Sequence, residues 1–333
     1  MSELPKNLIA SKENYDQEPK IDRRDFLIRA LVLFGTILLS PDESIAKHAT
    51  KQRHAQKKPV LKKPSIEQIS EKQKLIHQLL HEPIINAPKG EYNIATVDKW
   101  KQRYLGLDPE YHACGLTSEI LRDRLIAGWK RLIKKDDLKT IYNASQKYHV
   151  KSVDGKEYPI PLDTIFLALG ESHWDTKASS EAGAKGPWQF IEDTAKYFGL
   201  IKIIEVKKKK KKIRVDLRSN ISASTDAAMR LLQDNYQTTK NWDRNCKFTE
   251  KEIKKITEND RWAYAFWCYN RGQGNVKEHY IKFRGQSAPY SHVLSQNPTN
   301  TKIYQSSQYV LKLFGIREAV KEMYKNPRAY KLG

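Results

Sequence analysis

The sequence predicts a predominantly α-helical protein with one small β-hairpin insertion. Apolar side chains recur at intervals of three and four residues in several segments, the spacing that places them on one face of a helix. Alternating, β-branched runs are confined to residues 201–217, and no segment is repeated along the chain. A chain of 333 residues accommodates one or two domains with tails, so we expect a helical core flanked by extensions.

Helices are predicted from apolar spacing and from their start and stop signals. Ser65 and Gln68 form the Ser-x-x-Gln pattern of a capping box, which predicts that an amphipathic helix begins there. The Pro159-Ile160-Pro161-Leu162 segment is expected to open an apolar helix, because proline is tolerated in a first turn, and Gly170 is expected to end it. Glu171 is therefore placed at a helix C-terminus. Further helices are predicted over residues 118–136, 137–149, 225–236, 260–269 and 304–324.

Residues 201–217 have a different pattern from the rest of the chain. Two β-branched runs, 201–206 and 213–217, flank six consecutive lysines at 207–212. This arrangement predicts a β-hairpin with a charged tip, although a disordered basic loop fits the composition equally well.

Residues 1–46 have the features of an export signal. Arg23-Arg24-Asp25-Phe26-Leu27 precedes an apolar run at 30–39 that is shorter than the roughly 20 residues a membrane-spanning helix needs. Ser44 and Ala46 then provide small side chains for cleavage. The segment resembles a twin-arginine export signal, with an ordinary secretory signal or an uncleaved anchor as alternatives. We expect an exported protein of the periplasm or cell envelope, anchored to the membrane if the signal is retained.

The remaining chain divides into a basic linker, a helical extension at 65–150 and a main domain at 151–333. Residues 47–64 contain seven lysines and arginines and no acid, which predicts a disordered linker. The whole chain carries 60 Lys and Arg against 39 Asp and Glu, a net charge of +21. This excess favours a polyanionic partner, namely an anionic envelope polymer, a membrane surface or a nucleic acid, and charge alone does not choose among them.

Cysteine usage provides no sign of a metal site. The chain has three cysteines, Cys114, Cys246 and Cys268, so at least one thiol stays unpaired within a monomer, and a Cys114–Cys246 disulfide remains open. Neither Cys-x-x-Cys nor a zinc-type Cys/His spacing occurs, and no motif calls for an organic cofactor. We therefore expect neither a metal nor a cofactor.

Three clusters carry the candidate chemistry. In chain order they are Glu171-Ser172-His173-Trp174, Gly183-Ala184-Lys185-Gly186-Pro187-Trp188-Gln189-Phe190 and Cys268-Tyr269-Asn270-Arg271-Gly272. Their order and spacing resemble the lytic transglycosylase SLT domain family, particularly its membrane-bound D-type branch, which has Glu-Ser, Gly-Ala-x-Gly-Leu-x-Gln and Ala-Tyr-Asn motifs.

Two shorter stretches extend the resemblance, which covers about residues 158–314. They are Ser224-Thr225-Asp226-Ala227-Ala228 and Thr301-Lys302-Ile303-Tyr304. Pro187, where the family usually has leucine, and the 207–212 lysines depart from the pattern. The resemblance implies a lysozyme-like fold for residues 151–333.

The resemblance implies cleavage of the MurNAc–GlcNAc bond of peptidoglycan, with Glu171 as the catalytic acid. Burial beside aromatic side chains and the negative end of the preceding helix would both raise the pKa of Glu171 and keep it protonated. Most glycosidases use a second carboxylate, but Asp175 and Glu181 do not match catalytic positions of the family. In the family the same glutamate then acts as base towards the C6 hydroxyl, which yields a 1,6-anhydro-muramoyl product.

The resemblance also implies roles for neighbouring residues. Tyr269 is expected to hydrogen-bond and orient Glu171, with simple core packing as its alternative. The residues expected to bind substrate are Ser172, Gly186, Trp188, Gln189 and Asn270. A turn role for Ser172 and a core position for Trp188 remain open alternatives, and His173 is a tempting second acid or base for which a packed role competes.

Two other functions remain open at this point. One is a hydrolytic muramidase of the goose-type lysozyme style, and the other is a non-catalytic, basic wall-binding protein on the same scaffold. Peptidoglycan is the expected partner in each case. An export signal and an intact Glu171 argue against a nucleic acid.

Overall fold

The computed structural model describes residues 70–81, 85–86, 91–113, 115–134, 136–152, 154–206, 211–285 and 301–332. The predicted export signal, the basic linker, the capping box at Ser65 and the thiol of Cys114 lie outside the described residues. None of the described helices combines the length and apolar character that a membrane span requires.

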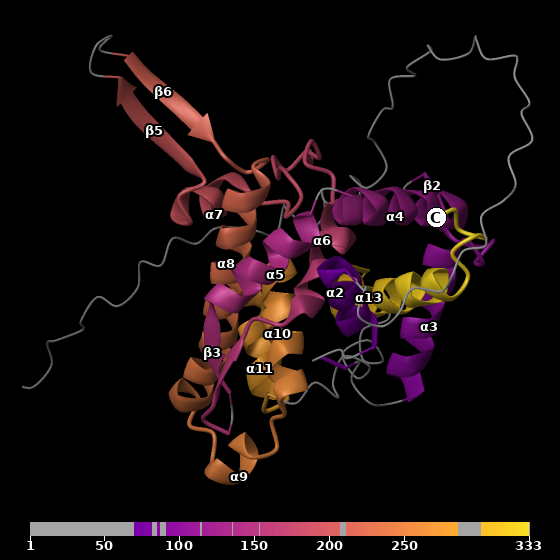
Figure 1. Ribbon diagram of the computed structural model, residues 1–333. Coiled ribbons are helices and arrows are strands. Elements are labelled where there is room, and N and C mark those ends of the chain that lie inside the picture. The colour runs from indigo at the N-terminus through magenta and orange to yellow at the C-terminus, as the bar shows by residue number, and fades with distance from the viewer. Residues whose placement is uncertain are drawn as a thin grey trace, which may run out of the picture.

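Helices dominate the described structure, as predicted (Figure 1). They are α2 Glu71–His81, α3 Glu91–Leu105, α4 Ser118–Lys134, α5 Asp137–Lys147, the 3₁₀ turn η2 Leu162–Thr164, α6 Ile165–Ser172, α7 Glu192–Tyr197, α8 Ile221–Asn245, α9 Glu250–Ile253, α10 Glu258–Arg271, α11 Gln273–Lys282 and α13 Thr301–Lys325. Three antiparallel strand pairs join them: β1 His112–Ala113 with β2 Leu116–Thr117, β3 His149–Lys151 with β4 Glu157–Pro159, and β5 Ile201–Val206 with β6 Lys211–Asp216.

The helix ends follow from caps rather than from apolar spacing. The side chain of Asn220 accepts a hydrogen bond from the backbone N–H of Ala223, which starts α8 before the predicted residue 225. Thr257 and Asp260 form a capping box that starts α10. The segment 159–162 opens the apolar helical stretch as predicted, but neither proline lies in its first turn. Pro159 ends strand β4, Pro161 precedes η2, and η2 leads directly into α6 at Ile165.

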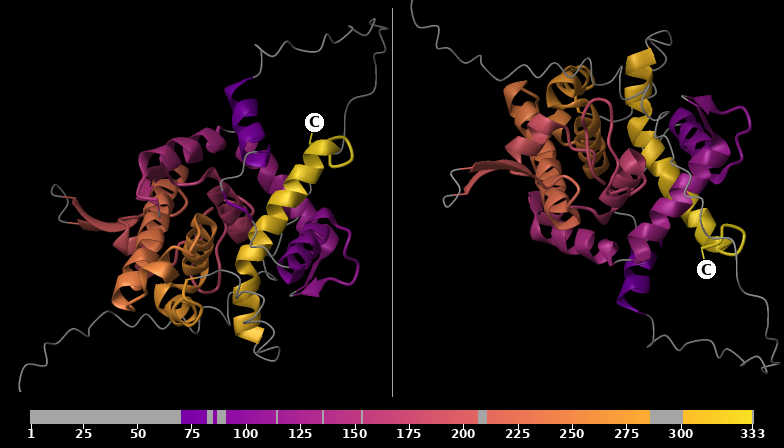
Figure 2. Two further views of the ribbon diagram at one scale, coloured as in Figure 1. Left: turned by 90° about the horizontal axis from the view of Figure 1, so that it is seen from below. Right: turned by 90° about the horizontal axis from the view of Figure 1, so that it is seen from above.

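The N-terminal extension and the main domain share one hydrophobic core. Helix α13, yellow in Figure 2, packs against α3 and also contacts α6 and α10. The crossing with α3 is close at Gly315, where an added Cβ would lie 2.4 Å from the Cβ of Trp100. Because α13 returns from the C-terminal part of the chain, it joins the extension to the helices around Glu171.

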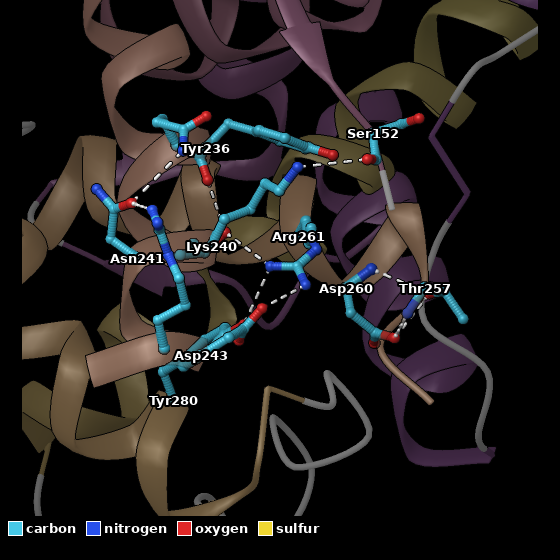
Figure 3. Close-up of polar contacts among 12 residues, drawn as sticks. Ser152, Tyr236, Lys240, Asn241, Asp243, Thr257, Asp260, Arg261 and Tyr280 are labelled. Carbon is cyan, nitrogen blue, oxygen red and sulfur yellow. Dashed lines mark hydrogen bonds and ion pairs between the residues drawn. The ribbon is translucent and has the colours of Figure 1, made fainter. Parts of the chain in front are cut away.

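A buried ion pair holds α8, α10 and α11 together (Figure 3). Arg261 Nη2 of α10 donates to Asp243 Oδ2 of α8 at 2.6 Å, and the hydroxyl of Tyr280 of α11 donates to Asp243 Oδ1 at 2.6 Å. Both ionised side chains are almost completely shielded from solvent. The stability of this arrangement therefore depends on each charge keeping its partner.

Residues 201–206 and 211–216 form the two antiparallel strands of the predicted hairpin. Ile203 pairs with Arg214, and Ile204 pairs with Ile213. Leu217 N–H donates to Leu200 O at 2.7 Å, which continues the pairing into the core. The hairpin projects away from the helices in Figures 1 and 2.

Candidate active site

Helix α6 presents Glu171 in its last turn. The helix ends at His173, whose backbone is left-handed with a φ of 53° and whose N–H donates to Leu169 O. Gly170 is therefore not the helix stop that the sequence predicted. An added Cβ at Gly170 would lie 2.8 Å from Leu313 Cδ2, so this glycine allows α13 to pack closely beside Glu171.

The Glu171 carboxyl is bonded by a residue of α13. The hydroxyl of Tyr309 donates to Glu171 Oε1 at 2.5 Å, and Lys312 Nζ donates to the neighbouring Gly170 O at 3.0 Å. Glu171 as a whole residue is partly exposed, while burial of its carboxyl by the surrounding protein raises the pKa of Glu171 above its usual value. Tyr309 and the charge of Lys312 oppose this shift without cancelling it.

Tyr269 lies close to Glu171 but has a different hydrogen-bond partner from the one predicted. Its hydroxyl donates to the backbone carbonyl of Trp188 at 2.7 Å. Burial raises the pKa of Tyr269 well above its usual value, and the charge of Glu171 adds to the increase. The hydroxyl that bonds Glu171 belongs to Tyr309, because α13 rather than α10 reaches the carboxyl from this side.

Trp188 is a core residue and does not offer its ring to a glycan. Its side chain is 0% exposed, and its indole Nε1 donates to Thr225 Oγ1 of α8 at 3.0 Å. The ring also meets Trp174 edge to face with centroids 5.9 Å apart. The predicted sugar contact of the Trp188 ring is therefore wrong, because the ring fixes the loop at 183–190 to the helical core.

Gly186 and Gln189 shape this loop. The φ of Gly186 is +79°, and an added Cβ would lie 1.9 Å from the carbonyl oxygen of Arg218. Gln189 has a φ of 49°, and its side-chain Nε2 donates to Gly186 O at 2.8 Å and to Ala178 O at 3.3 Å. Both residues serve the loop conformation, and their contact with substrate stays a prediction.

We expect Gly186→Ala to destabilise the fold by about 2 kcal/mol or more, since the new methyl group collides with backbone at a positive φ. Gly183→Ala is the matched control: Gly183 has a φ of +76°, but a Cβ there meets nothing within 4 Å. Thermal unfolding of the two variants separates the collision from the backbone strain that both share. Equal losses in the two variants would show that the close approach to Arg218 is unimportant.

Ser172 and Asn270 have different surroundings. The Ser172 hydroxyl donates to Pro187 O at 2.8 Å and accepts from the backbone N–H of Asp175 at 3.2 Å, so it joins the end of α6 to the loop. Asn270 is partly exposed in the last turn of α10, directly after Tyr269. The three sequence clusters therefore meet around Glu171, and substrate contacts of Ser172 and Asn270 stay predictions.

His173 does not act as a second acid or base in this arrangement. Its side chain is 6% exposed and packs beside Tyr104 of α3. Burial, together with nearby positive charges, lowers the pKa of His173 to about 3. The imidazole is therefore neutral at physiological pH and shielded from solvent.

Tyr309 and Lys312 were not among the residues predicted from the sequence. A signal was present, because Ser306-Ser307-Gln308-Tyr309 has the same spacing of hydroxyl residue and tyrosine as Thr301-Lys302-Ile303-Tyr304. The later copy supplies the tyrosine that reaches Glu171. The side chains of residues 301–307 lie outside the described part of the structure.

Comparisons with known proteins agree with this geometry. Residues 154–289 match the family model of the Transglycosylase SLT domain, a range that includes Glu171, the loop at 183–190 and Tyr269. The chain contains a transglycosylase SLT domain. The family predicted from the three clusters is confirmed.

Two curated relatives carry the name Membrane-bound lytic murein transglycosylase D. One is from Escherichia coli strain K12 and the other from Escherichia coli O6:H1 strain CFT073, and this SLT-domain chain is 28% identical to each over 177 residues. The aligned part makes up 53% of this chain and 30% of each relative. The chain thus spans less than a third of the length of these relatives.

Proposed function

We propose that this protein is a lytic transglycosylase that cleaves the MurNAc–GlcNAc bond of peptidoglycan, with Glu171 as acid and then as base. The observation that carries the proposal is Glu171, a partly exposed residue whose carboxyl has a raised pKa and accepts a hydrogen bond from the Tyr309 hydroxyl at 2.5 Å within an SLT domain. A protonated carboxylic acid that a glycan can reach is the minimum that glycosidic cleavage requires.

In the first step Glu171 gives its proton to the glycosidic oxygen as the bond from that oxygen to the muramoyl C1 breaks. The raised pKa favours the acid form that this step consumes. The carboxylate that remains is stabilised by the Tyr309 hydroxyl and by the positive charge of Lys312, which both favour the ionised form. Tyr309 and Lys312 therefore stabilise the carboxylate form of Glu171, which acts as the base in the second step.

In the second step the Glu171 carboxylate removes the proton of the C6 hydroxyl of the same muramoyl residue. The C6 oxygen forms a bond to C1, which closes a 1,6-anhydro ring and returns Glu171 to its protonated form. No water is consumed, and the proton given away in the first step is recovered in the second.

The surroundings of Glu171 support a mechanism with a single carboxylate. Among the described residues, the groups that shift the pKa of Glu171 are the burying protein atoms, Tyr309 and Lys312, and no second acid is among them. The nearby Asp175 serves the turn after α6, where its Oδ1 accepts the backbone N–H of Lys177 at 2.8 Å. A hydrolytic glycosidase usually places a second carboxylate beside the acid.

Product mass tests the proposal directly. Digestion of purified peptidoglycan should release muramoyl ends that are one water lighter than hydrolysed ends. Products that carry a free reducing end would instead identify a hydrolytic muramidase.

Tyr309→Phe is expected to move the alkaline limit of activity to higher pH. The Tyr309 hydroxyl lowers the pKa of Glu171, so its removal raises that pKa and keeps the acid form to a higher pH. The kcat for peptidoglycan cleavage should also fall, because the carboxyl loses the donor that orients it. A pH profile of kcat/KM checks the direction, and an alkaline limit that moves to lower pH contradicts the assigned hydrogen bond.

We place this activity in the cell envelope, where peptidoglycan is the partner. The name of the curated relatives describes a membrane-bound protein, and the paired arginines and apolar run within residues 1–46 fit export. Fusion of residues 1–46 to a reporter that is active only after export tests the signal, and replacing Arg23 and Arg24 by lysine distinguishes the twin-arginine route from an ordinary secretory one.

A further inference from the structure

The β5–β6 hairpin exposes large aliphatic side chains. Ile203 is 70% exposed, Ile204 47% and Ile213 45%. Ile204 and Ile213 lie opposite each other on one face of the hairpin, and Ile203, paired with Arg214, lies on the other. A projecting two-stranded ribbon that presents isoleucine on both faces has apolar surface that neighbouring helices do not cover.

The same hairpin is strongly basic. Among its described side chains Lys202, Lys212 and Arg214 are exposed, and Arg214 is paired with Glu192 of α7 at 3.0 Å. The acid nearest the core, Asp216, is paired with the buried Arg218 at 2.7 Å. The exposed part of the hairpin therefore combines positive charge with aliphatic surface.

This combination fits one kind of partner. A soluble polyanion would bind the lysines and leave the isoleucines in water, whereas the interface of an anionic bilayer accepts both. We propose that the β5–β6 hairpin docks onto the surface of an anionic phospholipid bilayer, with its isoleucines in the headgroup region and its basic side chains against lipid phosphates.

Arg218 connects the base of the hairpin to the loop at 183–190, which lies beside Glu171. Arg218 Nη1 donates to Gly183 O at 2.7 Å and to Phe190 O at 3.1 Å, and its Nη2 donates to Asp216 Oδ2 at 2.7 Å. The side chain of Arg218 is buried, and Ile201 at the start of β5 is buried in the core. A docked hairpin therefore fixes the orientation of the loop at 183–190, and with it Glu171, relative to the bilayer.

Hydrogen–deuterium exchange on the full chain tests the proposal locally, so that binding by other basic segments does not mimic it. Vesicles of phosphatidylglycerol and phosphatidylethanolamine should slow exchange in peptides covering residues 201–216 by roughly fivefold or more, since each basic residue near an anionic surface contributes favourably. Vesicles of phosphatidylcholine alone should leave these peptides unchanged.

Two sets of variants assign the contacts. The triple variant Ile203→Thr, Ile204→Thr, Ile213→Thr keeps β-branched side chains suited to strands and should lose the protection by vesicles. The double variant Lys202→Arg, Lys212→Arg keeps the positive charge and should retain the protection by vesicles. Unchanged exchange in the helices of each variant shows that the fold is intact.

Three results would overturn the docking proposal. The first is an absence of vesicle-dependent protection of residues 201–216. The second is equal protection by dextran sulfate that survives the threonine substitutions, which would identify a polyanion site. The third is protection that rises with protein concentration without vesicles, which would identify a second copy of the chain. Each measurement is independent of peptidoglycan cleavage, so an inactive Glu171 leaves the docking test unaffected.

Discussion

Replacing Glu171 by glutamine is expected to reduce the release of soluble peptidoglycan fragments by roughly 10²- to 10⁴-fold, the usual contribution of a general acid or base. The substitution keeps the size of the side chain and its ability to accept the Tyr309 hydrogen bond, but it removes the titratable proton. Both proposed steps require that proton. Quantitative mass spectrometry of the released fragments measures the loss.

Glu250→Gln provides the matched control for this substitution. Glu250 is exposed in the short helix α9, and its replacement by glutamine removes the same charge outside the candidate site. Full activity of Glu250→Gln together with full activity of Glu171→Gln would reject the catalytic role of Glu171. Tight binding of peptidoglycan without cleavage by either the wild type or Glu171→Gln would favour a wall-binding function.

The largest effect on stability is expected at the buried ion pair. Asp243→Ala removes the carboxylate that accepts hydrogen bonds from Arg261 and Tyr280, and leaves the guanidinium charged in a shielded position. Breaking a buried pair in this way costs about 3–5 kcal/mol of unfolding free energy. Urea denaturation of the wild type and the variant measures this difference.

A double variant tests the physical reason for that loss. Asp243→Leu with Arg261→Met removes both charges while keeping apolar volume, and we expect it to be more stable than Asp243→Ala. A loss below about 1 kcal/mol in Asp243→Ala would mean that water or side-chain movement compensates the uncovered arginine.

The parts of the fold that were predictable have a local cause. Helix α4 was found from its apolar stripe, and the hairpin at 201–216 from two β-branched runs around a charged centre. The three clusters around Glu171 were recognisable because their order and spacing are preserved within one continuous domain. Helix ends were less accurate, because side-chain caps such as Asn220 set them.

The parts that were missed depend on contacts between distant segments. Tyr309 is 138 residues from Glu171, and the bond between them depends on α13 crossing α6 where Gly170 leaves room. Trp188 was predicted to bind substrate, with a core position as the alternative. An aromatic side chain beside a catalytic motif can stack on a sugar ring or pack in the core, and the sequence does not distinguish the two. The partner of Trp188, Thr225, lies on α8, and apolar spacing within either segment does not show that contact.

Helix α13 belongs to the same packed unit as the SLT domain, although it lies outside the residues 154–289 that match the family model. The matched range ends at residue 289, before Tyr309, Lys312 and the leucine that covers Gly170. A chain trimmed to that range would lose the phenol bonded to its proposed acid and would expose an apolar side of α6. The same helix packs on α3, so we expect that a substitution in α3 that changes the position of α13 will alter the pKa of Glu171.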